Sequence, residues 1–114
     1  TGPGPRTRES IMARTISASV GAGGVNRKAD AVTVQELLNN VPPDDGGPTP
    51  PLVVDGLPWT KTIAAIRRFQ RIALGHKWPD GRVDPGGATL AGLNAFDAPQ
   101  PVADLLPPGP MWLV

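Results

Sequence analysis

The sequence predicts an all-α fold: a small three-helix, bundle-like domain with long Pro/Gly-rich loops and an extended C-terminal tail. Fourteen glycines and fifteen prolines make up about a quarter of the 114 residues, a content that indicates much irregular chain. Two windows, 25–41 and 59–74, contain neither residue, and a shorter window, 88–96, contains only Gly92. Because Gly and Pro interrupt helices, these three windows are the predicted helices.

The first window has the pattern of an amphipathic helix. Its apolar residues recur at intervals of three and four and fall on one face. They are Ala31, Val34, Leu37, Leu38 and Val41, and the opposite face carries Gln35, Glu36 and Asn39. We expect Asn26 to cap the N-terminus and the charge of Asp30 to suit the helix dipole near that end. Pro42 and Pro43 then end the helix.

The second window begins near Trp59 or Thr60, and Gly75 is the expected left-handed residue after its end. Its predicted core face consists of Ile63, Ile66, Phe69, Ile72 and Ala73, and the other side carries Arg67, Arg68 and Arg71. A run of charge on a helix is usually its solvated face, although such a stripe can also receive a carboxylate or phosphate.

The third helix is expected to begin near Gly87 or Ala88, to bury Leu90 and Leu93, and to end within 94–96. Residues 1–15 are expected to be a linker or a vector-derived segment, 16–96 the folded domain, and 97–114 a proline-rich tail. The tail also carries Leu105, Leu106, Met111, Trp112 and Leu113. Clustered apolar residues usually mark contact surfaces, so we expect this tail to pack as an extended segment.

Composition excludes several classes of function. The chain has no cysteine, so it has neither disulfides nor thiolate metal sites. Its formal net charge of +1 gives no reason to expect nucleic-acid or membrane-surface binding. A hydrolase would need a nucleophile with a base, a metal with several ligands, or opposed carboxylates, and the single His76 does not complete such a set. We therefore expect no enzyme, no cofactor and no metal.

A short pattern occurs twice along the chain. Val34-Gln35-x-Leu37 in the first helix matches Phe69-Gln70-x-Ile72 in the second. An Asp-Gly turn at 55–56 precedes Thr62 in the second helix, and another at 80–81 precedes Thr89 in the third. Each copy is a tight turn followed by a helix whose first turn holds a threonine. We expect both glutamines at the edge of the core, hydrogen-bonding loop backbone.

With these motifs, 19–94 resembles the peptidoglycan-binding domain family of small helical modules. The matching segments are Ala31 to Leu38, Asp55-Gly56, Thr62 to Gln70, Asp80-Gly81 and Thr89 to Leu93. The chain also looks like the subgroup associated with type VI secretion, through the segments 19–26, 34–39 and 79–87. The resemblance implies non-catalytic binding of bacterial cell-wall peptidoglycan, which would target or anchor an associated protein.

The candidate ligand site lies where the two Asp-Gly turns approach the start of the second helix. It consists of Asp55, Trp59, Thr60, Lys61, Trp78, Asp80 and Arg82. Exposed rings beside polar groups often hold sugars or peptides, although both tryptophans could instead cap a small core. A turn held by its own Asp and Arg side chains explains the Asp80–Asp84 segment as well as a role in ligand binding does.

A second function remains open beside cell-wall attachment: a protein-interaction or cargo-adaptor module of a type VI secretion apparatus. The partner would then be a secretion-system protein rather than peptidoglycan. The expected location is the cell envelope, the periplasm or the exterior, after a cytoplasmic stage. Residues 1–10 contain no hydrophobic signal-peptide centre.

Overall fold

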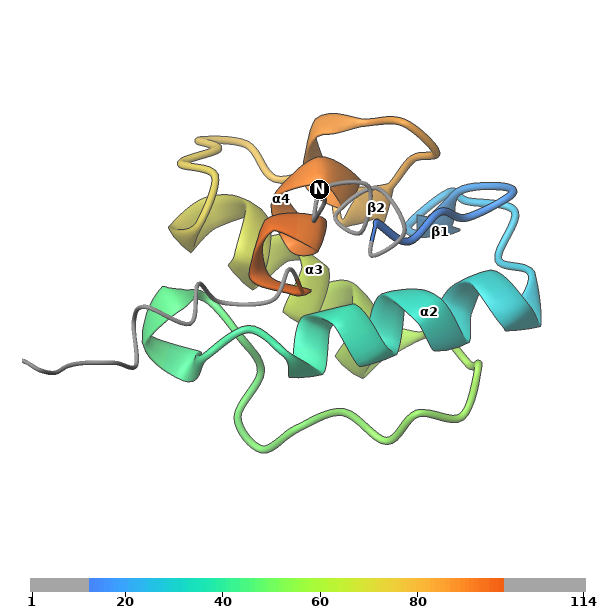
Figure 1. Cartoon of the computed structure of the whole chain (residues 1–114), viewed down its shortest axis with the longest axis horizontal. Helices are drawn as coiled ribbons and strands as arrows, with labels where there is room; N and C mark the ends of the chain where they lie inside the picture. Colours follow the sequence, from blue (N-terminus) through green and yellow to red (C-terminus); the bar gives the residue numbers. More distant parts are fainter. Residues whose placement is uncertain (1–12, 98–114) are drawn as a thin grey trace, which may run out of the picture.

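The computed structural model describes residues 13–97, which form three α-helices, one short 3-10 helix and one small sheet (Figure 1). In chain order these elements are β1 (Val20–Gly21), α2 (Lys28–Asn39), η1 (Pro43–Asp45), α3 (Thr60–Ile72), β2 (Arg82–Val83) and α4 (Ala88–Asp97). All three predicted helices are present, so the helical character of the fold is confirmed.

The fold is nevertheless not strictly all-α, because β1 and β2 pair in an antiparallel sheet. Val20 lies opposite Val83, and Gly21 lies opposite Arg82. Both valine side chains are fully buried in the core. Each strand has only two residues, which is too short to produce the alternating apolar pattern from which strands are predicted.

The core-facing side of α2 is the predicted one, except that the polar residues Asp30 and Gln35 are buried as well. Ala31, Val34, Leu37 and Leu38 are fully buried, and Val41 beyond the helix is nearly so. Gln35 was expected on the opposite face but is only 1% exposed. The predicted glutamine contacts with loop backbone bring this residue into the interior.

The start of α2 differs from the prediction. Asn26 is not the cap: the position before the helix belongs to Arg27, whose side chain makes no capping hydrogen bond. Asn26 has φ of 63°, and its side-chain oxygen accepts from the N–H of Gly21 at 2.7 Å. Asp30 is buried and accepts from the N–H and hydroxyl of Ser17. The Asn26 side chain therefore holds the segment before α2 rather than the end of the helix, whereas Asp30 lies in the first turn of α2, as predicted, and also binds the segment before it.

The buried face of α3 is rotated from the predicted one. Ile66 and Phe69 are fully buried, as expected, but Ile72 is 42% exposed. Thr62 and Gln70 are buried in its place. The apolar periodicity misses this rotation because it leaves out polar side chains whose hydrogen bonds are satisfied inside the protein.

The ends of the other helical segments agree closely with the prediction. Gly75 adopts the left-handed conformation, with φ of 70°, two residues beyond Ala73, the C-cap of α3.

In α4, Leu90 and Leu93 are buried. The Phe96 ring meets Phe69 edge to face, with the ring centres 6.0 Å apart. Contacts of this kind fix α4 against α3.

The long loop between α2 and α3 follows an extended course beside the helices (Figure 1). The Asn39 side-chain amide accepts from the N–H of Leu52 at 2.8 Å and donates to the carbonyl of the same residue at 2.9 Å. The Arg68 guanidinium donates to the carbonyls of Gly47 and Pro43 at 3.2 and 3.0 Å. Arg68 is therefore not part of a simple solvated face, because it anchors this loop to α3.

The folded unit includes Arg14, two residues before the expected boundary at 16. Its backbone N–H and carbonyl both pair with the Asn94 side chain of α4, and its guanidinium forms an ion pair with Glu36 at 2.8 Å. The apolar tail, 98–114, lies outside the described residues. Among the helices within 13–97, none is long and apolar enough to cross a membrane.

The packing of α3 predicts which of its apolar residues stabilise the fold. Ile66→Ala or Phe69→Ala removes a fully buried side chain, so we expect each to lower the free energy of unfolding by about 2 to 5 kcal/mol. Ile72→Ala, on the same helix, changes an exposed position and should cost well under about 1 kcal/mol. Urea unfolding monitored by circular dichroism measures all three. Equal losses at positions 66 and 72 would contradict this assignment.

Candidate ligand-binding site

The amide of Gln35 connects α2 to the first Asp-Gly turn and to α3. Its oxygen accepts from the N–H groups of Asp55 and Gly56 at 3.1 and 2.9 Å. Its nitrogen lies 3.1 Å from both the Asp55 carboxylate and the Thr62 hydroxyl. The same carboxylate oxygen accepts from the N–H of Leu57 at 2.9 Å. One buried side chain thus fixes both the shape and the position of this turn.

Gln70 does the same for the second turn. Its oxygen accepts from the N–H of Gly81 at 2.9 Å, and its nitrogen lies 2.8 Å from Asp80 and 3.1 Å from the Thr89 hydroxyl. The Asp80 carboxylate accepts from the N–H of Arg82 at 3.0 Å. The internal repeat in the sequence therefore corresponds to a repeated hydrogen-bond network, which joins α2 to α3 and then α3 to α4.

Glycine is required in both turns. Gly56 and Gly81 have φ of 76° and 72°, a conformation that other residues rarely adopt. A Cβ atom at Gly81 would also lie 2.9 Å from the Arg67 side chain. The Asp-Gly pairs noted in the sequence are consequently structural elements, and the aspartates that precede the glycines are held in fixed positions.

Hydrogen bonds lower the pKa of both turn aspartates. The pKa of Asp55 falls below its ordinary 3.8 chiefly because the N–H of Leu57, and then the Gln35 amide, donate to the carboxylate. For Asp80 the Gln70 amide has the largest effect. Burial raises the pKa of Asp30, but the hydrogen bonds from Ser17 and Ala18 outweigh it and lower the pKa overall. All three aspartates are ionised at neutral pH.

Four of the seven predicted site residues line one pocket. Asp55, Trp59, Thr60 and Lys61 surround a volume of about 340 Å³ between the first turn and the start of α3. The Trp59 side chain is 57% exposed, so the alternative in which it caps the core does not hold. Within 13–97 the Lys61 ammonium has no hydrogen-bond or ion-pair partner.

The other three predicted residues lie at the second turn. Trp78, Asp80 and Arg82 do not line this pocket. The first turn is held beside Thr62 and the second beside Gln70, and this step of eight residues corresponds to roughly 12 Å along α3. Trp78 is 83% exposed and, like Trp59, does not cap the core.

The other polar candidates are the arginines of the second turn and of the exposed face of α3. Arg82 pairs with Asp84 at 3.0 Å, which fits the interpretation of this segment as a self-held turn. Arg67 and Arg71 are exposed, as expected of a solvated face. Within 13–97 no group of three or more His, Asp or Glu side chains could hold a metal ion.

Five residues that line the pocket are absent from the predicted site: Gln35, Leu52, Val53, Leu57 and Thr62. Leu52 and Val53 line it from the long loop, and no spacing in the sequence connects this loop to α3. Asn39 and Arg68, which hold the loop in place, were the only signal: a polar residue at the end of one helix and a cation on the next.

In comparisons with known proteins, no family model, no curated protein and no solved structure matches this chain.

The Gln70 network predicts a cost for removing its amide. Gln70→Leu leaves the buried N–H of Gly81 and the Thr89 hydroxyl without their partner, so we expect the free energy of unfolding to fall by about 1 to 3 kcal/mol. Arg71→Leu, at the next and exposed position of α3, is the matched control and should change it by less than about 0.5 kcal/mol. Unfolding in urea measures both. An unchanged midpoint for Gln70→Leu would show that the network does not stabilise the fold.

The lowered aspartate pKa values also predict a pH dependence. A carboxyl whose pKa is lower in the folded state stabilises that state above its unfolded pKa, here the ordinary 3.8, and this stabilisation is lost as pH falls through the folded pKa. The free energy of unfolding should therefore decrease on acidification below this value. Asp80→Asn keeps an acceptor oxygen but removes the charge. The free energy of unfolding of this variant should therefore decrease less on acidification than that of the parent. Urea unfolding between pH 7 and 2 tests both; greater stability in acid would contradict the sign.

Proposed function

We propose that this protein binds bacterial cell-wall peptidoglycan without cleaving it, through the pocket formed by Asp55, Trp59, Thr60 and Lys61, and thereby anchors an associated protein. The observation that supports this most directly is that an exposed indole, an ionised carboxylate and an ammonium without a partner among the described residues line one pocket of about 340 Å³. Pockets that combine an apolar ring with a few oriented polar groups are typical of small-ligand sites.

The charges suit a ligand that carries both an amine and a carboxylate. Asp55 uses only its Oδ1 atom to hold the turn, and within 13–97 its Oδ2 atom has no partner. Oδ2 can therefore accept from a ligand ammonium, and Lys61 can donate to a ligand carboxylate. The stem peptide of peptidoglycan carries both groups, and charge-assisted hydrogen bonds of this kind are the stronger ones.

The sequence resemblance supports the choice of cell wall over other ligands with the same charges. The Asp-Gly turn at 55–56 and the helix that follows Thr62 are the motifs shared with the peptidoglycan-binding domain family. In the structure these two motifs are joined by Gln35 and flank the pocket. On this proposal the protein acts in the cell envelope, the periplasm or outside the cell.

A second candidate function is a protein-interaction or cargo-adaptor module of a type VI secretion apparatus. Apolar side chains follow one another on the exposed side of the loop before α3: Val53, Val54, Leu57 and Trp59. Neighbouring exposed apolar residues are a feature of protein interfaces. In this alternative the same surface would contact a secretion-system protein.

The contrast between the two tryptophans tests the proposed site. Trp59→Ala should weaken co-sedimentation with purified sacculi by tenfold or more, a loss of about 1.4 kcal/mol, because the ring forms a wall of the pocket. Trp78→Ala is the control, since Trp78 is exposed but lies outside this pocket; it should bind like the parent. Circular dichroism checks that both variants are folded.

Two outcomes would contradict the proposal. If Trp59→Ala and Trp78→Ala weaken co-sedimentation equally, the pocket is not the binding site. If the parent chain stays in the supernatant at high micromolar concentration, cell-wall binding is excluded. In that second case, co-purification with a defined secretion component, abolished by Leu57→Asp, would favour the adaptor function.

A further inference from the structure

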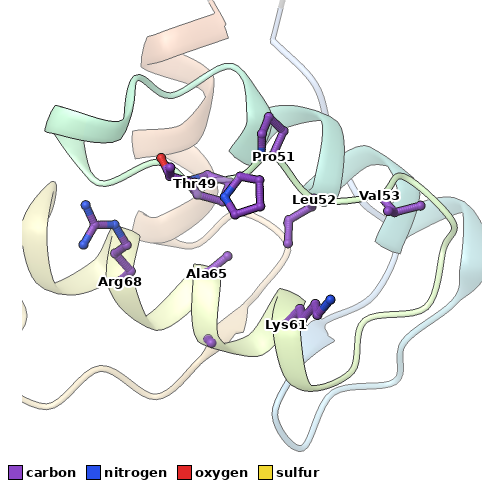
Figure 2. Close-up of a pocket in the computed structure, with 10 residues that line it drawn as sticks. Thr49, Pro51, Leu52, Val53, Lys61, Ala65 and Arg68 are labelled. Atoms are coloured by element: carbon purple, nitrogen blue, oxygen red, sulfur yellow. The ribbon is translucent and has the colours of Figure 1, made fainter.

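A second pocket adjoins the candidate site and extends it along α3. It has a volume of about 490 Å³ and lies between the loop 48–53 and α3. Leu52, Val53 and Lys61 line both pockets. Figure 2 shows the loop side chains along one side of the second pocket, with Lys61 near Val53 at one end and Arg68 near Thr49 at the other. The two pockets together form a groove, which we call the loop–α3 groove.

The walls of this second pocket are mainly apolar and small. Pro48, Pro50 and Pro51 form the loop side, and Ala64 and Ala65 form the helix side. Sugar hydroxyls placed against such walls would lose hydrogen bonds to water without gaining protein partners, which is unfavourable. Methyl groups, by contrast, gain from burial there. The wall chemistry therefore favours a chain with small apolar side chains over a glycan.

The cations of the groove are not equivalent. Arg68 is engaged, because two of its nitrogens donate to the carbonyls of Gly47 and Pro43. Lys61, at the junction of the two pockets, has no partner within 13–97. A ligand that follows the groove thus meets an available positive charge at Lys61, and a carboxylate is the group that complements it.

The loop also offers unpaired backbone. Val53 is 74% exposed, and within 13–97 its N–H donates no hydrogen bond. Extended peptides are commonly recognised by pairing with such free backbone groups while their side chains enter neighbouring pockets. The Val53 N–H can donate one hydrogen bond to a peptide carbonyl of the ligand, whereas the Val53 carbonyl already accepts from the N–H of Asp55.

We infer that the loop–α3 groove binds the peptide part of peptidoglycan: an extended stem peptide with a carboxylate at Lys61 and alanyl methyl groups against Ala64 and Ala65. This inference rests on the proposed cell-wall function and names the part of the polymer that is recognised. The glycan strand then lies outside the groove, and the Trp59 pocket holds the amine-bearing section of the same peptide.

The test uses the full chain and two soluble probes, the synthetic pentapeptide Ala-γ-Glu-diaminopimelate-Ala-Ala and a chitin tetrasaccharide. The pentapeptide should compete with sacculi in co-sedimentation, and the tetrasaccharide should not. Ala64→Leu fills the second pocket from an exposed helix position and should weaken pentapeptide binding by tenfold or more in isothermal titration calorimetry. Ala91→Leu, exposed on α4, is its control and should stay within twofold of the parent.

A second pair of variants keeps the test valid if Ala64→Leu does not fold. Lys61→Gln should weaken pentapeptide binding by tenfold or more, whereas Lys77→Gln, another exposed lysine, should not. If the tetrasaccharide displaces the protein from sacculi and the pentapeptide does not, this inference is overturned and the proposed function stands. The same follows if an Ala64→Leu chain is folded and binds like the parent. Pentapeptide binding without any sacculus binding would overturn the proposed function and support the groove assignment.

Discussion

Two buried glutamine amides hold the irregular part of this protein to its helices. Each satisfies a turn N–H with its oxygen, and with its nitrogen reaches an aspartate of that turn and a threonine in the first turn of the next helix. A buried backbone N–H left unpaired would cost free energy comparable to a lost hydrogen bond. Because a long loop cannot supply these partners from its own backbone, the glutamines of the preceding helices supply them. The packing of the helices, the position of both turns and the location of the pocket all depend on these hydrogen bonds.

The same arrangement positions the chemistry of the candidate site. Gln35 orients Asp55 through one carboxylate oxygen, lowers the pKa of Asp55 together with the N–H of Leu57, which has the larger effect, and leaves the other oxygen without a partner among the described residues. Trp59, Thr60 and Lys61 follow at the start of α3, where Thr62 is tied to the same amide. Hydrogen bonds thus hold Asp55 and Thr62 in place on either side of Trp59, Thr60 and Lys61, and such preorganisation reduces the entropy that a ligand would otherwise have to overcome. The second turn has the same internal network but a different surface, with Trp78 outside the pocket.

Within the fold, the sequence predicted the helices well because Gly and Pro interrupt them so sharply. It misplaced the side chains whose position depends on polar contacts. Asn26 has the residue type of a helix cap but holds a left-handed turn. The helical periodicity places Gln35 on the polar face although it is buried, whereas its predicted hydrogen bonds to loop backbone are confirmed. The two-residue strands were missed because their pairing partners lie more than 60 residues apart, a separation over which local propensity says nothing. Ile72 is exposed for a related reason: Gln70 and Thr62 occupy the buried side of α3.

The sequence by itself predicted the three helices, the repeated Gln, Asp-Gly and Thr pattern, and four of the residues that line the pocket, because these features are set by local spacing and turn chemistry. Only the tertiary structure decided that the second turn lies away from that pocket, since this depends on where along α3 each turn is held: the first beside Thr62, through Gln35 of α2, and the second beside Gln70. It also decided that the loop 48–53 faces α3 and forms a groove. Asn39 and Arg68 bring those segments together, and contacts between residues far apart in the chain become visible only once the backbone has folded.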